Sequence, residues 1–181
     1  MLFRSGAAMG LAGAARGGDV LFLEALGAAG IETRVVLPLE KKEFHAASVA
    51  GGDPAWSQRF TDCLAQAKSL HVANSHSATA DGSAFEYGTR ILLGLARLHA
   101  RRLDTDLRAL VLWDGERGDG HGGTAWAVEH LLERGVPVEN VFPGREGPVA
   151  AAPCSAAHTH DRGRPIRAML FSDRSEEHTS E

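Results

Sequence analysis

Two glycine-rich segments carry the residue types that bind anions in proteins. The first spans residues 10–19 and includes Gly13, Arg16, Gly17, Gly18 and Asp19. The second spans residues 114–124 and includes Asp114, Gly120, Gly122, Gly123 and Thr124. Glycine lets a backbone approach a phosphate closely, and the exposed N–H groups at a helix start carry partial positive charge. Both segments are therefore candidate sites for a ligand that bears phosphate.

The first segment has two explanations. Arg16 is the charged group that can add a hydrogen bond to an anion, while Asp19 is expected to act as the N-cap of the following helix. A glycine-rich turn between a strand and a helix also serves close packing without any ligand. Ligand binding and packing both stay open here.

The second segment lies between a clear strand and a clear helix, a context that favours ligand binding. Thr124 offers a hydroxyl at the helix start, and Asp114 at the strand end either holds a ribose hydroxyl or caps the loop. No Gly-Lys-Ser/Thr follows, as it would in a Walker loop. The sequence therefore gives no support for hydrolysis of a nucleoside triphosphate.

One further cation belongs to the candidate site. Glu86 and Arg90 are four positions apart on a predicted helix, where they form an ordinary surface ion pair or present Arg90 to the ligand crevice. His76 and His121 lie near the same region without the spacing of a metal site. We expect these histidines to be solvated.

The hydrophobic pattern predicts the frame that positions these residues. Short β-branched runs alternate with longer stretches of helical period, which is typical of a parallel sheet covered by helices. Strands are predicted at residues 33–38, 70–74, 108–113 and 138–142, with a shorter one at 7–11. Helices are predicted at residues 19–30, 53–67, 83–102 and 124–135. In such a sheet ligands bind at the carboxyl ends of the strands, where both glycine-rich segments lie.

Composition narrows the classes of partner. The 181 residues include 44% hydrophobic and 23% charged side chains, enough for one sizeable core. The formal net charge is −4 without a long run of either sign, so neither a nucleic-acid face nor a polybasic membrane anchor is indicated. Cys63 and Cys154 have no metal or disulfide spacing, and no apolar run suits a membrane helix. We expect a cytoplasmic protein that binds small molecules or proteins.

Ordered motifs along the chain resemble one family of domains. They are residues 17–24, 36–38, 43–49, 56–60, 85–90 and 113–124. This set is similar to a Rossmann-like domain of the SLOG superfamily, the group that holds the DprA and LOG proteins, in the bacterial form found beside tetratricopeptide repeats and class III adenylate or guanylate cyclase domains. The resemblance covers about residues 6–145. It implies a doubly wound, mostly parallel sheet with helices on both faces, which senses a nucleotide or nucleotide-derived ligand and regulates a neighbouring cyclase.

The end of the chain resembles a second domain. Residues 165–173 are similar to the first strand of a class III cyclase, in which the matching aspartate binds one of two catalytic metal ions. By that match Asp173 is a metal ligand in the intact parent, with Mg²⁺ or Mn²⁺ as the cofactor. We expect this chain to require no cofactor and to lack cyclase activity, because by the same match the second aspartate and the substrate-recognition residues would follow in sequence.

These resemblances imply a layout of the chain. Residues 6–148 form the ligand-binding domain, truncated at its N-terminus, and residues 149–164 form a linker. Residues 1–5 and 174–181 resemble translated sequencing-adapter sequence, with a charged natural tail as the alternative for the second. Because the family's opening strand and helix are absent, we expect part of the core to be exposed and the stability to be reduced.

Two other functions stay open. LOG enzymes that release nucleobases use Gly-Gly-x-Gly-Thr-x-x-Glu, whereas here the glutamate after Thr124 is Glu129, two positions too late. That shift rotates the carboxylate by about 200° around a helix. A LOG-like nucleotide phosphoribohydrolase is therefore the second hypothesis, and a ligand-free structural adaptor is the third.

Overall fold

The computed structural model describes residues 7–74, 82–115, 123–144, 146–149 and 166–169. Its strands are β1 (Met9–Ala12), β2 (Glu32–Leu37), β3 (Ser69–Val72), β4 (Leu107–Val111), β5 (Val138–Asn140), β6 (Gly147–Pro148) and β7 (Ile166–Met169). Its helices are α1 (Gly18–Ala28), α2 (Lys41–Ser48), α3 (Ala55–Gln66), α4 (Gly82–Leu103) and α5 (Thr124–Glu133). The fold class is α/β, as the sequence predicts.

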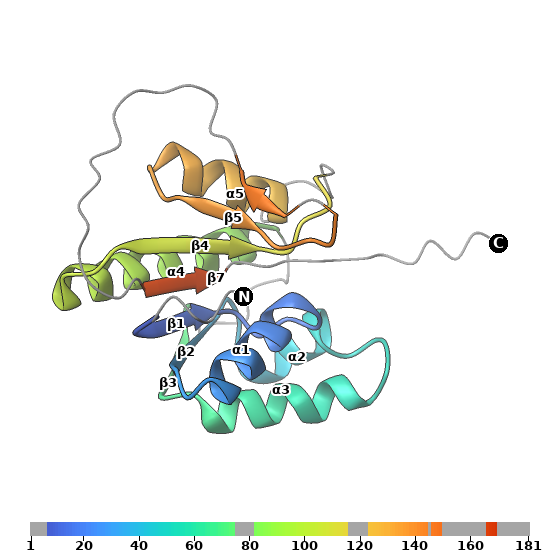
Figure 1. The fold of residues 1–181 in the computed structure, drawn as a ribbon. Coiled ribbons are helices and arrows are strands. Elements are labelled where there is room, and N and C mark those ends of the chain that lie inside the picture. Colours follow the sequence, from blue (N-terminus) through green and yellow to red (C-terminus); the bar gives the residue numbers. More distant parts are fainter. Residues whose placement is uncertain (1–6, 75–81, 116–122, 145, 150–165, 170–181) are drawn as a thin grey trace.

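One sheet organises these elements, in the strand order β3-β2-β1-β7-β4-β5-β6 (Figure 1). Every neighbouring pair is parallel except β5 with the short β6, which is antiparallel. The predicted strands agree with β1 to β5 to within a few residues. Pairing is parallel because a helix connects most successive strands and returns the chain to the starting edge.

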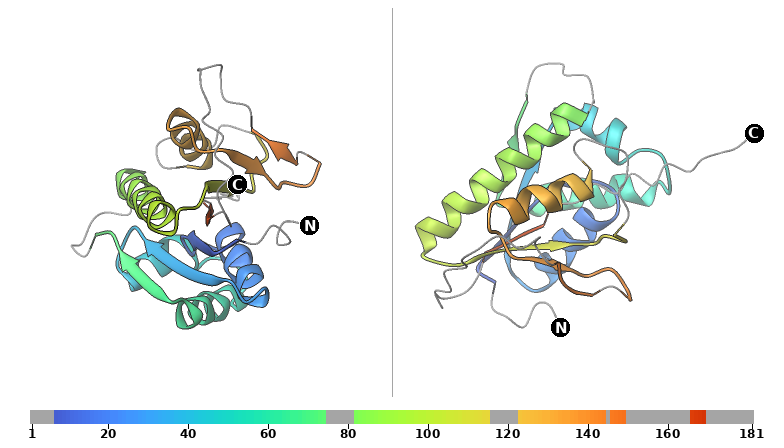
Figure 2. Two further views of the ribbon diagram at one scale, coloured as in Figure 1. Left: turned by 60° about the vertical axis from the view of Figure 1, so that its left-hand side comes forward. Right: turned by 90° about the horizontal axis from the view of Figure 1, so that it is seen from above.

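Helices cover both faces of the sheet (Figures 1 and 2). Strand side chains alternate between two cores because successive residues of a strand point to opposite faces. Leu11, Ala109 and Val111 pack with α4 and α5. Ala12, Val35 and Leu110 pack with α1, α2 and α3. The sheet therefore lies between two apolar layers, as in other α/β domains.

Helix α2 was not predicted as an element of its own. It is short and charged, and Phe44 is its buried residue. Phe44 stacks on Phe60 of α3, with ring centroids 6.1 Å apart. One buried side chain in eight residues gives too little periodicity to indicate a helix from sequence, so tertiary packing decides this element.

Strand β7 departs from the predicted layout. Residues 166–169 form a strand, as predicted, but pair with β1 on one side and β4 on the other instead of beginning a separate domain. The physical reason is that β1 and β4 each leave a row of backbone groups that another strand can satisfy. The predicted linker from residue 150 on and the adapter-like ends at 1–5 and 174–181 lie outside the described residues.

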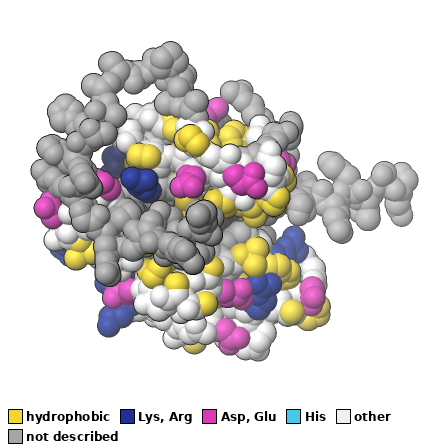
Figure 3. Space-filling view, viewed as in Figure 1, with side chains coloured by type: hydrophobic (Ala, Val, Ile, Leu, Met, Phe, Trp, Pro, Cys, Tyr) yellow, Lys and Arg dark blue, Asp and Glu magenta, His cyan; other side chains and the backbone are white. Residues whose placement is uncertain are grey.

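Described side chains of both charges are visible on the face in Figure 3. Lys and Arg side chains alternate there with Asp and Glu side chains and with scattered hydrophobic ones. Within the described part of the chain, no helix combines the length and apolar character that crossing a membrane requires.

Candidate functional site

The two glycine-rich segments leave the sheet at the same edge. β1 and β4 both run parallel to β7, and Ala168 of β7 is in register with Leu11 on one side and Ala109 on the other. The residues after β1 and after β4 therefore emerge on either side of β7, about 10 Å apart, which is two strand spacings. The topology thus allows a single ligand to reach both segments.

A carboxylate closes the turn between β1 and α1. Asp19 is only 1% exposed, and its Oδ2 accepts the backbone N–H of Ala15 at 3.0 Å. A Cβ on Gly13 would lie 2.4 Å from that oxygen, so a side chain there would have to displace the carboxylate. The prediction that Asp19 is the N-cap is wrong: α1 begins at Gly18, its N-cap is Gly17 with φ 94°, and Asp19 lies in the first turn.

This arrangement changes the interpretation of the first segment. A helix start favours negative charge, and in α1 the buried carboxylate of Asp19 supplies that charge from within the chain. Gly13 makes room for Asp19, and Gly18 is itself buried. These residues therefore serve packing of the turn, which was the second of its two explanations, and a phosphate at this helix start would meet a like charge.

Arg16 points toward the loop that follows α2. Its backbone N–H donates to the carbonyl oxygen of Ser48 at 3.0 Å. A Cβ on Gly52 would lie 2.6 Å from its Nη1, so the guanidinium rests on the glycines at 51 and 52. Among the described residues, no carboxylate pairs with it. Arg16 is thus a half-buried cation that can bind an anion at the carboxyl edge.

The start of α5 contrasts with that of α1. Its N-cap is Gly123, which makes no side-chain cap hydrogen bond, and no acidic residue lies in the first turn with Thr124. Within the described ranges, the first turn of α5 therefore holds no carboxylate like the one that Asp19 places in the first turn of α1. Asp114 follows β4 at the same edge, while Gly120 and Gly122 lie outside the described residues.

No family model, curated protein or solved structure matches this chain. The site is therefore interpreted from its own residues. Within the described ranges, no group of three or more His, Cys, Asp or Glu side chains has the arrangement of a metal site. Asp173, the metal ligand implied for the parent, lies outside those ranges.

Asn140 is a site-forming residue that the sequence analysis missed. It is 7% exposed at the end of β5, and its Oδ1 accepts the N–H groups of Trp113 and Phe142, each at 3.1 Å. Its Nδ2 donates to the carbonyl oxygen of Trp113 at 2.7 Å. Asn140 therefore fixes the backbone immediately before Asp114. The available signal was an amide side chain in a strand, where asparagine is disfavoured.

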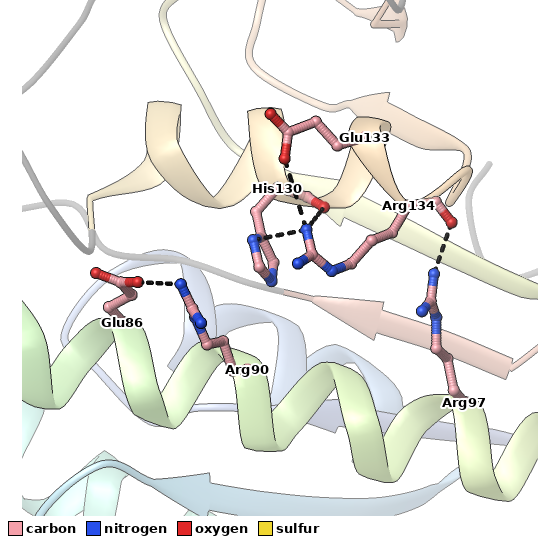
Figure 4. Close-up of polar contacts among 6 residues, drawn as sticks. All are labelled: Glu86, Arg90, Arg97, His130, Glu133 and Arg134. Carbon is pink, nitrogen blue, oxygen red and sulfur yellow. Dashed lines mark hydrogen bonds and ion pairs between the residues drawn. The ribbon is translucent and has the colours of Figure 1, made fainter. Parts of the chain in front are cut away.

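Arg90 of α4 lies beside α5 (Figure 4). It forms the predicted ion pair with Glu86, one turn earlier on the same helix. Its guanidinium also lies 5.8 Å from the centroid of the Trp126 ring, within the range of a cation–π contact. The side chain is 55% exposed, so it can turn toward a ligand at the start of α5.

His130 continues this cluster into the protein (Figure 4). Its ring stacks on Trp126 with centroids 4.7 Å apart, and Nη1 of Arg134 lies 2.9 Å from its Nδ1. A guanidinium can only donate, so Nδ1 accepts and the neutral ring carries its proton on Nε2. Burial lowers the pKa of His130, and the charges of Arg134 and Arg90 lower it further. The imidazole is therefore neutral at pH 7.

We expect acid to destabilise the protein through His130. The lowered pKa means that the unfolded chain binds this proton more readily, so stability falls as the pH drops below the unfolded value of 6.5 and continues to fall until the folded pKa is passed. Urea unfolding of the wild type and His130→Gln from pH 8 to pH 5 measures the effect. The variant should show a shallower loss, and identical slopes would contradict this assignment.

A separate cavity lies at the opposite edge of the sheet. Its volume is about 330 Å³, and Glu32, Thr33, Cys63, Gln66 and Lys68 contribute to its lining. Burial raises the pKa of the Cys63 thiol to about 11, which keeps it protonated at neutral pH. The cavity lies at the amino ends of β2 and β3, away from both glycine-rich segments.

Proposed function

We propose that this chain is a sensing domain for a nucleotide or nucleotide-derived ligand, with a doubly wound, Rossmann-like sheet. The observation that carries the proposal is the start of α5, at the same edge as the turn after β1. α1 and α5 cover opposite faces, so the chain winds in opposite directions on the two sides of β7. Open α/β sheets bind ligands at the edge where this reversal occurs.

The charges suggest how the ligand lies. Phosphate binds the N–H groups at Gly123 and Thr124, because the start of α1 already holds the carboxylate of Asp19. Arg16 approaches from the β1 side as a second cationic contact, and Arg90 approaches from α4. Asp114 accepts a ribose hydroxyl. This assignment places phosphate on the β4 side of the crevice.

The activity that this domain would regulate is proposed from the resemblance alone. The motifs are similar to those of domains that accompany class III adenylate or guanylate cyclases and tetratricopeptide repeats. We therefore propose that the domain regulates a cyclase in a longer cytoplasmic protein, where Asp173 helps to hold Mg²⁺ or Mn²⁺. The base-releasing alternative gains no support, because Glu129 is exposed in the middle of α5, whereas catalysis needs a carboxylate at the helix start.

Gly123→Asp tests the phosphate site. A carboxylate at this N-cap would repel phosphate, and we expect at least a tenfold loss of affinity, about 1.4 kcal/mol. Calorimetric titration with AMP, ADP, ATP and their guanine counterparts measures the change. Gly123 has φ −78° and ψ 176°, which any residue adopts, so the substitution does not strain the backbone.

Gly123→Asn is the matched control, since it has nearly the same shape without the charge and is an equally good N-cap. It should bind the same nucleotide with an affinity close to that of the wild type. Equal losses in the two variants would show that shape, not charge, governs the site. The absence of saturable binding to every nucleotide in the set would refute the proposed function.

A further inference from the structure

Strand β7 completes the middle of the sheet. β1 pairs with β2 on its outer side and β4 pairs with β5, while the inner sides of β1 and β4 both pair with β7. We call the space between the inner sides of β1 and β4 the seam. The residues along it are buried, including Leu11 at 1%, Ala109 at 0% and Leu110 at 2% exposure. Unpaired backbone groups at such positions are costly, so the seam cannot stay empty.

The seam can be closed in two ways. With β7 in place, β1 and β4 are two strand spacings apart. Without β7, β1 and β4 can pair directly, because both are parallel to β7 and therefore to each other. The order would then be β3-β2-β1-β4-β5-β6, and the two halves of the sheet would lie closer by one spacing, about 4.8 Å. Both arrangements satisfy the backbone of β1 and β4.

Helix α4 can hold the two halves together in either arrangement. It contacts β1 and β2 on one side of the seam, β4 on the other, and β7 between them (Figure 2). Leu92, Leu93 and Ala96 of α4 belong to one apolar core with Leu11 of β1 and Ala109 of β4. Loss of β7 therefore would not separate the halves.

We propose that the seam between β1 and β4 is a binding site for one parallel strand, that its occupant is Ile166–Met169 of this chain, and that release of the strand lets β1 pair with β4. β7 runs parallel to β1 and β4 and lies between them, so its carboxyl end lies at the edge from which the two glycine-rich segments start. This inference rests on the proposed function in one respect: the affinity for the ligand would depend on the distance between β1 and β4, which β7 sets. Ligand binding and the docking of β7 would thereby be coupled.

Disulfide trapping tests the occupancy of the seam. Arg108 and Arg167 are register partners, and Arg108 is exposed. In a full-length Cys154→Ser background, the pair Arg108→Cys and Arg167→Cys should cross-link rapidly under mild oxidation. The control pair, Arg108→Cys with Ala168→Cys, places the thiols on opposite faces of the sheet and should react at least tenfold more slowly. Equal rates would overturn the proposed occupancy.

Release of the strand is tested with Ala168→Pro, which removes an N–H from β7, and with Ala168→Ser, which retains it. Spin labels at Leu21 of α1 and Glu133 of α5, both exposed, report the separation of the halves. We expect the proline variant to stay folded and the distance to shorten by a part of one strand spacing of about 4.8 Å, because α1 and α5 lie on opposite faces of the sheet, with no change in the serine variant. An unchanged distance, or an unfolded proline variant, would overturn direct pairing of β1 with β4.

Titration with ADP separates this inference from the proposed function. The affinity of the cross-linked protein should differ severalfold from that of its reduced form, and ADP should shift the docking equilibrium of β7 by the same factor. Cross-linking with equal ADP affinities would overturn the coupling and leave the proposed function intact. Cross-linking without ADP binding would count against the coupling, while the strand site itself would be upheld.

Discussion

Asn140→Ala is expected to lower the free energy of unfolding by about 2–4 kcal/mol, since it removes three half-buried hydrogen bonds that contribute about 0.5–1.5 kcal/mol each. The substitution removes the acceptor for the N–H groups of Trp113 and Phe142 and the donor to the carbonyl of Trp113. Urea unfolding, followed by circular dichroism, measures the loss. We also expect weaker nucleotide binding, because the backbone before Asp114 loses its support.

Asn140→Asp separates the accepting role of the Asn140 side chain from its donating role. Its carboxylate can still accept both N–H groups, but it cannot donate to Trp113 and would place negative charge 2.7 Å from that carbonyl oxygen. We expect a loss of stability comparable to that of the alanine variant near pH 7 and a smaller one at low pH, where a protonated carboxyl can donate. A loss below about 1 kcal/mol in Asn140→Ala would show that the freed groups find other partners.

The elements were predictable where the hydrophobic pattern is local. β2, β4 and β5 are short apolar runs, and α1, α3, α4 and α5 follow or end at turn-forming residues, so their positions follow from periodicity and capping signals. The arrangement of β7 was not predictable in the same way. Its partners are β1 and β4, far away in sequence, and no local pattern states which strand edges remain open.

The site was predictable by residue type but not by orientation. The sequence placed Gly13 after a strand and Gly123 before a helix, and the structure places them there. It did not indicate that Asp19 turns back to accept the N–H of Ala15. This places a carboxylate in the first turn of α1, whereas the first turn of α5 holds no acidic residue. The sequence pattern of an aspartate beside glycines is the same whether the carboxylate faces a ligand or bonds to its own backbone.

The same limit applies to the cluster beneath Arg90. Trp126, His130 and Arg134 are spaced four apart, which indicates one face of a helix and no more. The spacing does not show that His130 is buried or that Arg134, at the end of the same helix, fixes its tautomer. The charge state of this histidine therefore depends first on burial and then on the charges of Arg134 and Arg90, and the spacing of residues along α5 does not reveal that burial.

Two glycines of α4 should respond in opposite directions to the same substitution. Gly88 is buried, and a Cβ there would lie 2.6 Å from Cβ and 3.0 Å from Cα of Pro38, whose backbone cannot easily move. Gly94 is exposed, and a Cβ there would meet no atom within 4 Å. Alanine at either position gains the same helix propensity, so the difference between the variants isolates the packing of α4 against the end of β2.

We expect Gly88→Ala to lower the free energy of unfolding by about 1–3 kcal/mol through overpacking. Gly94→Ala should raise it by about 0.5–1 kcal/mol, because alanine loses less backbone entropy in a helix than glycine does. Thermal and urea unfolding of both variants beside the wild type give the two values. Because α4 spans the seam around β7, a stabilising Gly88→Ala would mean that α4 does not rest on Pro38, and the proposed role of α4 in holding the two halves together would fail with it.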